Sequence, residues 1–130
     1  MDGWKRFGGP IAFVLVACGA LAIPARADDD IDRVLQESGK VRYEQYCTAC
    51  HGPDGAPGSA KTDLRTYVKR HGGKFPAADW LAIIADTRPA SPHTTVWERI
   101  RADQINTSGD VAARGVVGQI ARYVMSIQAP

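Results

Sequence analysis

Two cysteines and a histidine stand close together in the segment Cys47-Thr48-Ala49-Cys50-His51. A C-x-x-C-H arrangement is typical of the covalent attachment of a c-type haem. Each cysteine sulfur can add across one vinyl group of the porphyrin, and a two-residue spacer suits the separation of the two vinyl groups. The adjacent histidine then lies next to the iron and serves as its proximal ligand. The motif therefore predicts one covalently bound haem c, with Cys47, Cys50 and His51 as its binding residues.

A C-x-x-C pair can also form half of a zinc site or act as a redox-active dithiol. A zinc site needs a second pair of ligands, and the sequence contains no further C-x-x-C and no H-x₃₋₅-H pair. A redox dithiol of this spacing normally lies in a βαβ pattern, which the sequence lacks. The histidine that directly follows the second cysteine favours haem attachment over both alternatives.

The first 27 residues have the features of an export signal. Lys5 and Arg6 form a positive region, an apolar run extends from Ile11 to Ile23, and Ala25-Arg26-Ala27 follows as a cleavage site. The apolar run is too short to span a membrane comfortably. We therefore expect residues 1–27 to be removed during export.

The same region contains a second processing signal. Leu15-Val16-Ala17-Cys18 resembles a bacterial lipobox, which would place a lipidated Cys18 at the mature N-terminus. With either signal the domain at residues 28–130 leaves the cytoplasm, and covalent haem attachment outside the cytoplasm agrees with this. The sequence predicts a periplasmic location, with a lipid anchor facing the periplasm as the alternative.

The charge balance of the exported domain is neutral. The chain has 16 basic and 14 acidic residues, and residues 1–27 include three of the basic and one of the acidic residues. The formal charge of residues 28–130 is therefore zero, which gives no support to nucleic-acid binding. A domain of about a hundred residues buries only a modest core, and a covalently held haem would add a large apolar plate to it.

Two helices are predicted at the ends of the domain. Asp28-Asp29-Asp30 suits the start of a helix that runs to the vicinity of Cys47, with apolar residues at helical spacing. Gly39 in its middle suits a close approach of another helix. In the C-terminal segment, one buried face is predicted from a spacing of three or four residues. These apolar positions are Ile31, Val34 and Leu35 in the first helix, and Val116, Ile120, Val124 and Ile127 in the last.

Gly39, Tyr43 and Cys47-x-x-Cys50-His51-Gly52 together resemble the opening of class I c-type cytochromes, small monohaem proteins of bacterial periplasms. In that family the glycine lets the N-terminal helix cross the C-terminal helix against an aromatic residue. The segment Val116–Ile127, which contains Tyr123, is similar to that partner helix. The resemblance implies an all-α fold of the small class I cytochrome c type, in which these two helices cross beside the haem.

The middle of the chain contains a loop and two further predicted helices. The loop at residues 52–58 is rich in glycine and proline, and in the family it covers the proximal face and supplies a carbonyl that accepts a hydrogen bond from the histidine. Thr62 or Asp63 can cap a short helix through His71, and another helix is predicted from Pro76 to Asp86. Basic residues crowd this region, either as a solvated face or as a docking surface for acidic redox partners. They are Lys61, Arg65, Lys69, Arg70 and Lys74.

The sixth iron ligand is the open question of the sequence. The family loop often reads Met-Pro-Val-Trp-Gly, whereas this chain has Thr94 at the methionine position, before Val96-Trp97. We expect Met125 to be a packing or surface residue of the last helix. His71 suits a helix cap, whereas His93 lies next to the lost methionine position. His93 is the predicted distal ligand, and an open distal site is the alternative.

The side chains around that loop suggest further contacts with the haem. Trp97 can pack on the haem or bind a propionate, and burial in the core explains it equally well. Arg88 is a second candidate for a propionate, with a role at the surface as its alternative.

The resemblance implies a carrier of single electrons between respiratory or dehydrogenase partners, either alone or as the haem subunit of a larger oxidoreductase. No nucleophile–base pair is apparent in the sequence, so we expect no enzymatic turnover. An imidazole in place of a thioether ligand would lower the haem potential. An open distal site would instead predict a protein that binds small ligands, as a sensor or a peroxidase-like enzyme.

Overall fold

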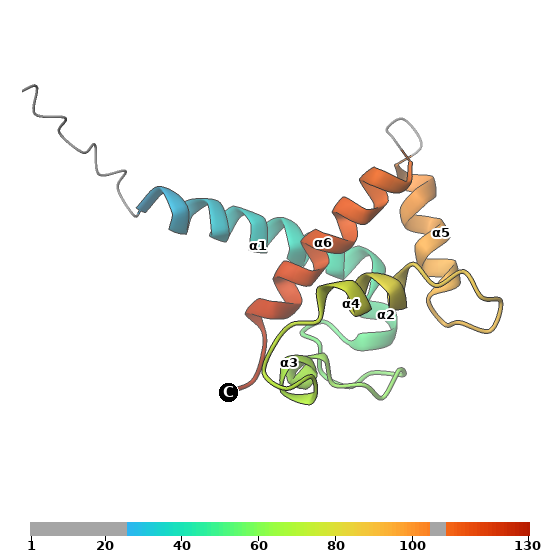
Figure 1. Cartoon of the computed structure of the whole chain (residues 1–130), viewed down its shortest axis with the longest axis horizontal. Helices are drawn as coiled ribbons and strands as arrows, with labels where there is room; N and C mark the ends of the chain where they lie inside the picture. The colour runs from blue at the N-terminus through green and yellow to red at the C-terminus, as the bar shows by residue number, and fades with distance from the viewer. Residues whose placement is uncertain (1–25, 105–108) are drawn as a thin grey trace, which may run out of the picture.

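The computed structural model describes residues 26–104 and 109–130, and in these ranges every regular element is helical (Figure 1). The predicted all-α fold is confirmed. Apart from its last two residues, the predicted export signal lies outside the described residues, as does Cys18. None of the helices in the described ranges has both the length and the apolar character that crossing a membrane requires. The elements in chain order are α1 (Arg26–Tyr46), α2 (Thr48–His51), the 3₁₀ helix η1 (Leu64–Thr66), α3 (Tyr67–Arg70), α4 (Ala77–Ile84), α5 (Thr94–Asp103) and α6 (Asp110–Ser126).

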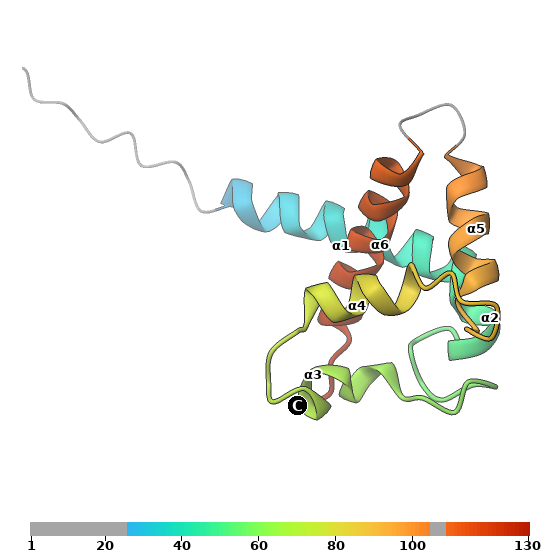
Figure 2. The ribbon, with the colours of Figure 1, turned by 45° about the vertical axis from the view of Figure 1, so that its right-hand side comes forward.

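The crossing of α1 and α6 is the main contact between helices, and both views show α6 passing over the middle of α1 (Figures 1 and 2). Gly39 is buried at this crossing, and a Cβ atom there would overlap the backbone carbonyl of Gln119 and lie 3.1 Å from Cβ of Tyr123. One turn further along α1, the rings of Tyr43 and Tyr123 pack with their centroids 5.0 Å apart. The predicted glycine-and-aromatic crossing is therefore confirmed.

The N-terminal turns of α1 extend beyond the body of the protein (Figure 1). The side chains of Ile31 and Val34 are each 58% exposed, although their spacing is that of one helix face. The reason is that α6 crosses α1 near Gly39 and leaves these turns uncovered. An ion pair of 2.9 Å between Arg122 and Asp32 links α6 to this part of α1.

The predicted short helix is split into η1 and α3. Asp63 caps η1 by accepting a hydrogen bond of 3.0 Å from the backbone N–H of Arg65. His71 follows α3 as its C-cap, and its Nδ1 lies 2.8 Å from the carbonyl oxygen of Tyr67. The chain then turns at Gly72 and Gly73, which both have positive φ angles. The predicted capping role of His71 is confirmed.

Two helices differ from the sequence prediction. The resemblance places Thr94 and Val96-Trp97 in the distal loop of the family, whereas in the structure they belong to α5, ten residues of helix that begin directly after His93. Helix α6 begins at Asp110, six residues before the predicted start. Ile100 of α5 and Ile120 of α6 are both fully buried. Packing of these two helices in the core explains why α5 forms despite its two N-terminal threonines, which are weak helix formers.

The C-terminal tail fastens the middle of the chain to α6. Oε1 of Gln128 accepts a hydrogen bond of 2.8 Å from the backbone N–H of Val68. The amide nitrogen of the same side chain donates to the carbonyls of Leu64 and Val124, at 2.9 and 2.6 Å. One side chain thus ties η1 and α3 to the end of α6.

The helix crossing gives a direct test. We expect Gly39→Ala to lower the free energy of unfolding by about 1–3 kcal/mol, because the new methyl group forces two backbones apart. Gly118→Ala on the exposed side of α6 is the matched control, since a Cβ atom there meets no atom within 4 Å. It should raise the stability by about 0.5–1 kcal/mol, the usual gain of alanine over glycine in a helix. Thermal unfolding of the haem-loaded variants measures both, and equal stability of the two would contradict the role of Gly39.

Candidate functional site

A cavity of about 550 Å³ lies within the helical body, and its volume is in the usual range for pockets that bind small molecules and cofactors. Most of its wall is apolar, with aromatic and branched residues such as Tyr67, Trp80 and Ile120. Four other residues that line it are the predicted haem ligands Cys47, Cys50, His51 and His93. The structure therefore brings all four predicted site residues to one apolar chamber.

The cysteine–histidine motif forms a tight turn that continues directly from α1. The backbone N–H of Cys47 donates to the carbonyl of Tyr43 at 2.8 Å, and that of His51 donates to the carbonyl of Cys47 at 2.9 Å. The Tyr43 hydroxyl donates a further hydrogen bond of 2.8 Å to the carbonyl of Gly52. Because Tyr43 is fixed by the helix crossing, this bond holds the motif in a defined position against α1.

The environment of the two thiols disfavours the alternative chemistries. Burial, followed by the neighbouring Cys50, raises the pKa of the Cys47 thiol to about 12. A redox-active dithiol instead requires a lowered thiol pKa, because the thiolate is the reactive form. Among the described residues, no group of three or more histidine, cysteine or acidic side chains could hold a metal ion. Neither the dithiol nor the zinc alternative gains support.

The imidazole of His51 is half-buried on one side of the cavity. Burial and then the charge of His93 lower its pKa, while the backbone of Thr62 acts in the opposite direction. The ring is therefore neutral at physiological pH, as an iron ligand must be. Its Nδ1 is buried without a hydrogen bond of ordinary geometry, and the nearby Thr62 backbone is the candidate for the predicted carbonyl partner. The sequence did not identify this residue.

His93 lies at the N-cap of α5, at the end of a loop that is held by its own hydrogen bonds. The Thr94 hydroxyl lies 2.7 Å from the carbonyl of Arg88 and 3.0 Å from that of Asp86. The backbone N–H of His93 donates to the Ser91 hydroxyl at 3.3 Å. These bonds clasp the two ends of the loop together and set the backbone position of His93.

The side chain of Asp86 closes the same loop. Its carboxylate accepts two hydrogen bonds from Arg88 Nε, at 2.9 and 3.0 Å, and one of 2.6 Å from an Arg88 terminal nitrogen. These bonds hold the pKa of the Asp86 carboxyl well below its usual range. Burial lowers the pKa of His93, opposed by the charge of Asp86 and by the nearby Ile83 backbone. His93 is accordingly neutral as well.

The rings of His51 and His93 both line the cavity and lie close together. Their centroids lie 6.3 Å apart and their planes are within 5° of parallel. Two imidazoles bound to opposite sides of one metal have centroids about 6 Å apart, for a metal–nitrogen bond of about 2 Å. The apolar wall, the two thiols and this pair of rings fit a haem with both axial positions taken by histidine.

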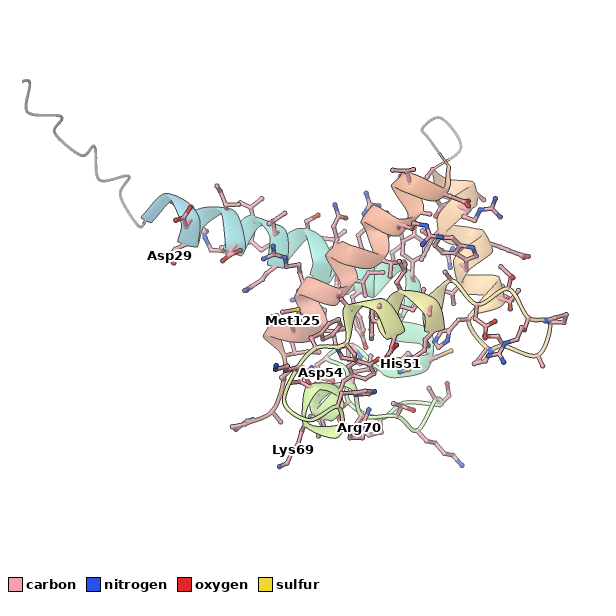
Figure 3. All side chains as sticks on the ribbon, in the orientation of Figure 1. Asp29, His51, Asp54, Lys69, Arg70 and Met125 are labelled. Carbon is pink, nitrogen blue, oxygen red and sulfur yellow. The ribbon has the colours of Figure 1, made fainter. Side chains whose placement is uncertain are left out.

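The remaining candidates for iron ligands and propionate contacts lie away from the cavity wall. Met125 is 49% exposed on the outside of α6, as expected (Figure 3). Trp97 is buried in the core at 3% exposure, which favours packing over propionate binding. The Arg88 side chain is 84% exposed and paired with Asp86, so the suggested propionate contact is not supported. His71 caps α3 and leaves His93 as the histidine that faces His51.

The five basic residues of the predicted docking surface differ in the contacts that they make. Arg65 forms an ion pair of 2.9 Å with Asp63, and Arg70 donates to the Asp63 carbonyl at 2.8 Å. Figure 3 shows Lys69 reaching away from α3 on the outside of the protein. The two arginines therefore help to hold η1 and α3, and Arg70 is exposed like the three lysines of the set.

Comparison with known proteins identifies one family. The family model described as Cytochrome c matches residues 36–113, which include the cysteine–histidine motif and His93. No curated protein and no solved structure matches the chain significantly.

The loop that carries His93 yields a stability test. We expect Thr94→Val to lower the free energy of unfolding by about 1 kcal/mol, because the hydrogen bonds to the Asp86 and Arg88 carbonyls are lost while the side-chain shape is kept. Thr95→Val is the matched control, since Thr95 is exposed and its change should stay within about 0.5 kcal/mol. Thermal unfolding of the haem-loaded protein compares them, and equal losses would show that the Thr94 hydroxyl does not clasp the loop.

Proposed function

The chain belongs to the cytochrome c family, and we propose that it carries single electrons outside the cytoplasm with two histidines as iron ligands. The family binds haem c covalently and serves in electron transfer. The observation that carries the proposed ligation is the parallel pair of imidazoles, 6.3 Å apart, in an apolar cavity lined by both cysteines. The bound haem supplies the one-electron couple.

The residues on the proximal side attach and orient the cofactor. Cys47 and Cys50 supply the thioether sulfurs, and His51 supplies the proximal nitrogen. The bond from Tyr43 to the carbonyl of Gly52 keeps this turn in place against α1. Cys50 is exposed, so this edge of the site is the one that a partner can approach for electron transfer.

Several observations support His93 as the distal ligand. Its ring lines the same cavity as His51 and is held neutral by burial. The clasp formed by Thr94 fixes its backbone. Thr94, at the position of the family methionine, uses its hydroxyl for this clasp. We expect a lower haem potential than in relatives that have a methionine ligand.

The proposed location rests on the N-terminal signal. A positive region, an apolar run and the Ala25-Arg26-Ala27 site support export and cleavage. Cytochrome c domains typically work outside the cytoplasm, which agrees with this reading. Retention on the membrane through a lipidated Cys18 is the alternative, and mass analysis of the mature N-terminus distinguishes the two.

We assign partner docking to the exposed lysines Lys61, Lys69 and Lys74. Lys61 is exposed and directly follows the cavity-lining residue Ala60, and Lys69 and Lys74 are exposed on and after α3. Their positive charge would steer an acidic redox protein of a respiratory or dehydrogenase system towards the haem. A larger oxidoreductase that holds this chain as its haem subunit could use the same surface.

A spectrum with and without carbon monoxide tests the ligation. We expect the wild-type protein to be low-spin and unresponsive to the gas when reduced, because His93 occupies the sixth position. His93→Ala should become high-spin and bind carbon monoxide, whereas His71→Ala, which removes a helix cap, should keep the wild-type spectrum. Ready binding by the wild-type protein would instead favour the alternative of an open site that serves a sensor or a peroxidase-like enzyme.

The docking surface can be tested with a small anionic oxidant. Ferricyanide should oxidise the reduced protein at a rate that falls as salt is added, because the lysine charges attract the anion. Replacing Lys69 and Lys74 by glutamate should slow the reaction at low salt and weaken its salt dependence. Lys40→Glu on α1, where the lysine lies 3.8 Å from Glu44, is the control and should leave the rate close to wild type. Equal effects of both changes would argue against a local docking surface.

A further inference from the structure

Tyr67 brings an unsatisfied polar group to the wall of the haem cavity. Its side chain lines the cavity and the residue is only 6% exposed. The hydroxyl oxygen is buried and has no hydrogen-bond partner among the described residues. Buried hydroxyl groups in native proteins are almost always hydrogen-bonded, since an unmade bond is costly. A partner from the cofactor would remove this cost.

The ring of Tyr67 is held firmly in this position. The edge of Trp80 packs against it with the ring centroids 5.4 Å apart, and His71 packs on it at 4.3 Å. The hydrogen bond from the backbone of Val68 to Gln128 fixes the next residue of α3 to the C-terminal tail. These contacts keep the ring in the wall of the cavity.

The hydroxyl acts as a donor at physiological pH. Burial and then the charge of Asp79 raise the pKa of Tyr67, so the phenol stays protonated. It needs an acceptor that the cavity wall does not provide. Tyr46 lines the same cavity but differs in this respect, because its hydroxyl donates a hydrogen bond of 2.8 Å to Asp103.

A haem offers strong acceptors mainly at its two propionates, because the rest of the macrocycle is apolar. Thioether bonds to Cys47 and Cys50 would fix the vinyl edge beside α2, and the propionates extend from the opposite edge of the porphyrin. Helix α3, which carries Tyr67, lies apart from α2 in both views (Figures 1 and 2). We propose that the Tyr67 hydroxyl donates a hydrogen bond to a haem propionate and so positions the haem. This inference rests on the proposed haem site.

The contact would affect the redox properties as well as the position of the haem. A donor to a propionate stabilises its negative charge and lowers the propionate pKa. Without that donor, the uncompensated charge would favour the oxidised iron. The Tyr67 hydroxyl thus takes the role that the sequence suggested for Trp97 or Arg88, neither of which lines the cavity.

Resonance Raman spectra of the haem-loaded variants test the proposal. Tyr67→Phe removes only the hydroxyl, and we expect a shifted propionate bending band and a lower midpoint potential, with covalent haem and the low-spin spectrum kept. Tyr46→Phe is the matched control, since it removes a hydroxyl from the same cavity that already bonds to Asp103. It should leave the propionate band in place.

A second measurement needs no substitution. In the NMR spectrum of the reduced wild-type protein, the Tyr67 hydroxyl proton should exchange slowly and show a nuclear Overhauser effect to a propionate methylene. Absence of this effect, or an unchanged propionate band in Tyr67→Phe, overturns the contact while leaving electron transfer intact. Carbon monoxide binding by Tyr67→Phe would place the hydroxyl at the distal ligand and also overturn it. Lack of covalent haem in the wild-type protein would reject the proposed function itself.

Discussion

The contact on which the structure depends is the close crossing of α1 and α6 at Gly39. Because position 39 has no side chain, the two helix backbones approach each other closely there. One turn further along α1, the rings of Tyr43 and Tyr123 pack between the two helices. Tyr43 is fully buried by this packing, and its hydroxyl holds the carbonyl of Gly52. The position of the cysteine–histidine turn is therefore set by a helix crossing that lies beside the cavity and outside its wall.

The wall of the cavity that carries His93 is held in place by a different kind of interaction. Its loop is closed by bonds between its own residues, with the Thr94 hydroxyl at the carbonyls of Asp86 and Arg88. Few of these bonds involve the crossing helices. The proximal side thus follows from packing of the core, whereas the distal side follows from a local network. A change of distal ligand within this loop is compatible with the same helical scaffold.

Local patterns in the sequence were sufficient to predict the helix crossing and to recognise the haem-attachment motif. The motif depends on adjacent residues, and Gly39 and Tyr43 have roles that follow from helical spacing alone. Helix α5 was missed because its first residues, Thr94 and Thr95, favour loops, and only the burial of Ile100 against α6 makes the helix stable. The Tyr67 hydroxyl, which has no partner within the described part of the chain, could not be predicted either, because its pairing depends on the acceptors around it in three dimensions.

In the proposed arrangement, His93 and any small ligand compete for the same position on the iron, since the centroids of the two imidazoles are only 6.3 Å apart. That separation leaves room for the iron and its two bonds but not for an additional molecule. A small ligand could therefore bind only if His93 moved away. Because His93 is bonded through its backbone to Ser91 and is followed by the clasp at Thr94, movement of the His93 backbone requires those hydrogen bonds to break. The stability of the distal loop then determines how strongly the site is restricted to electron transfer.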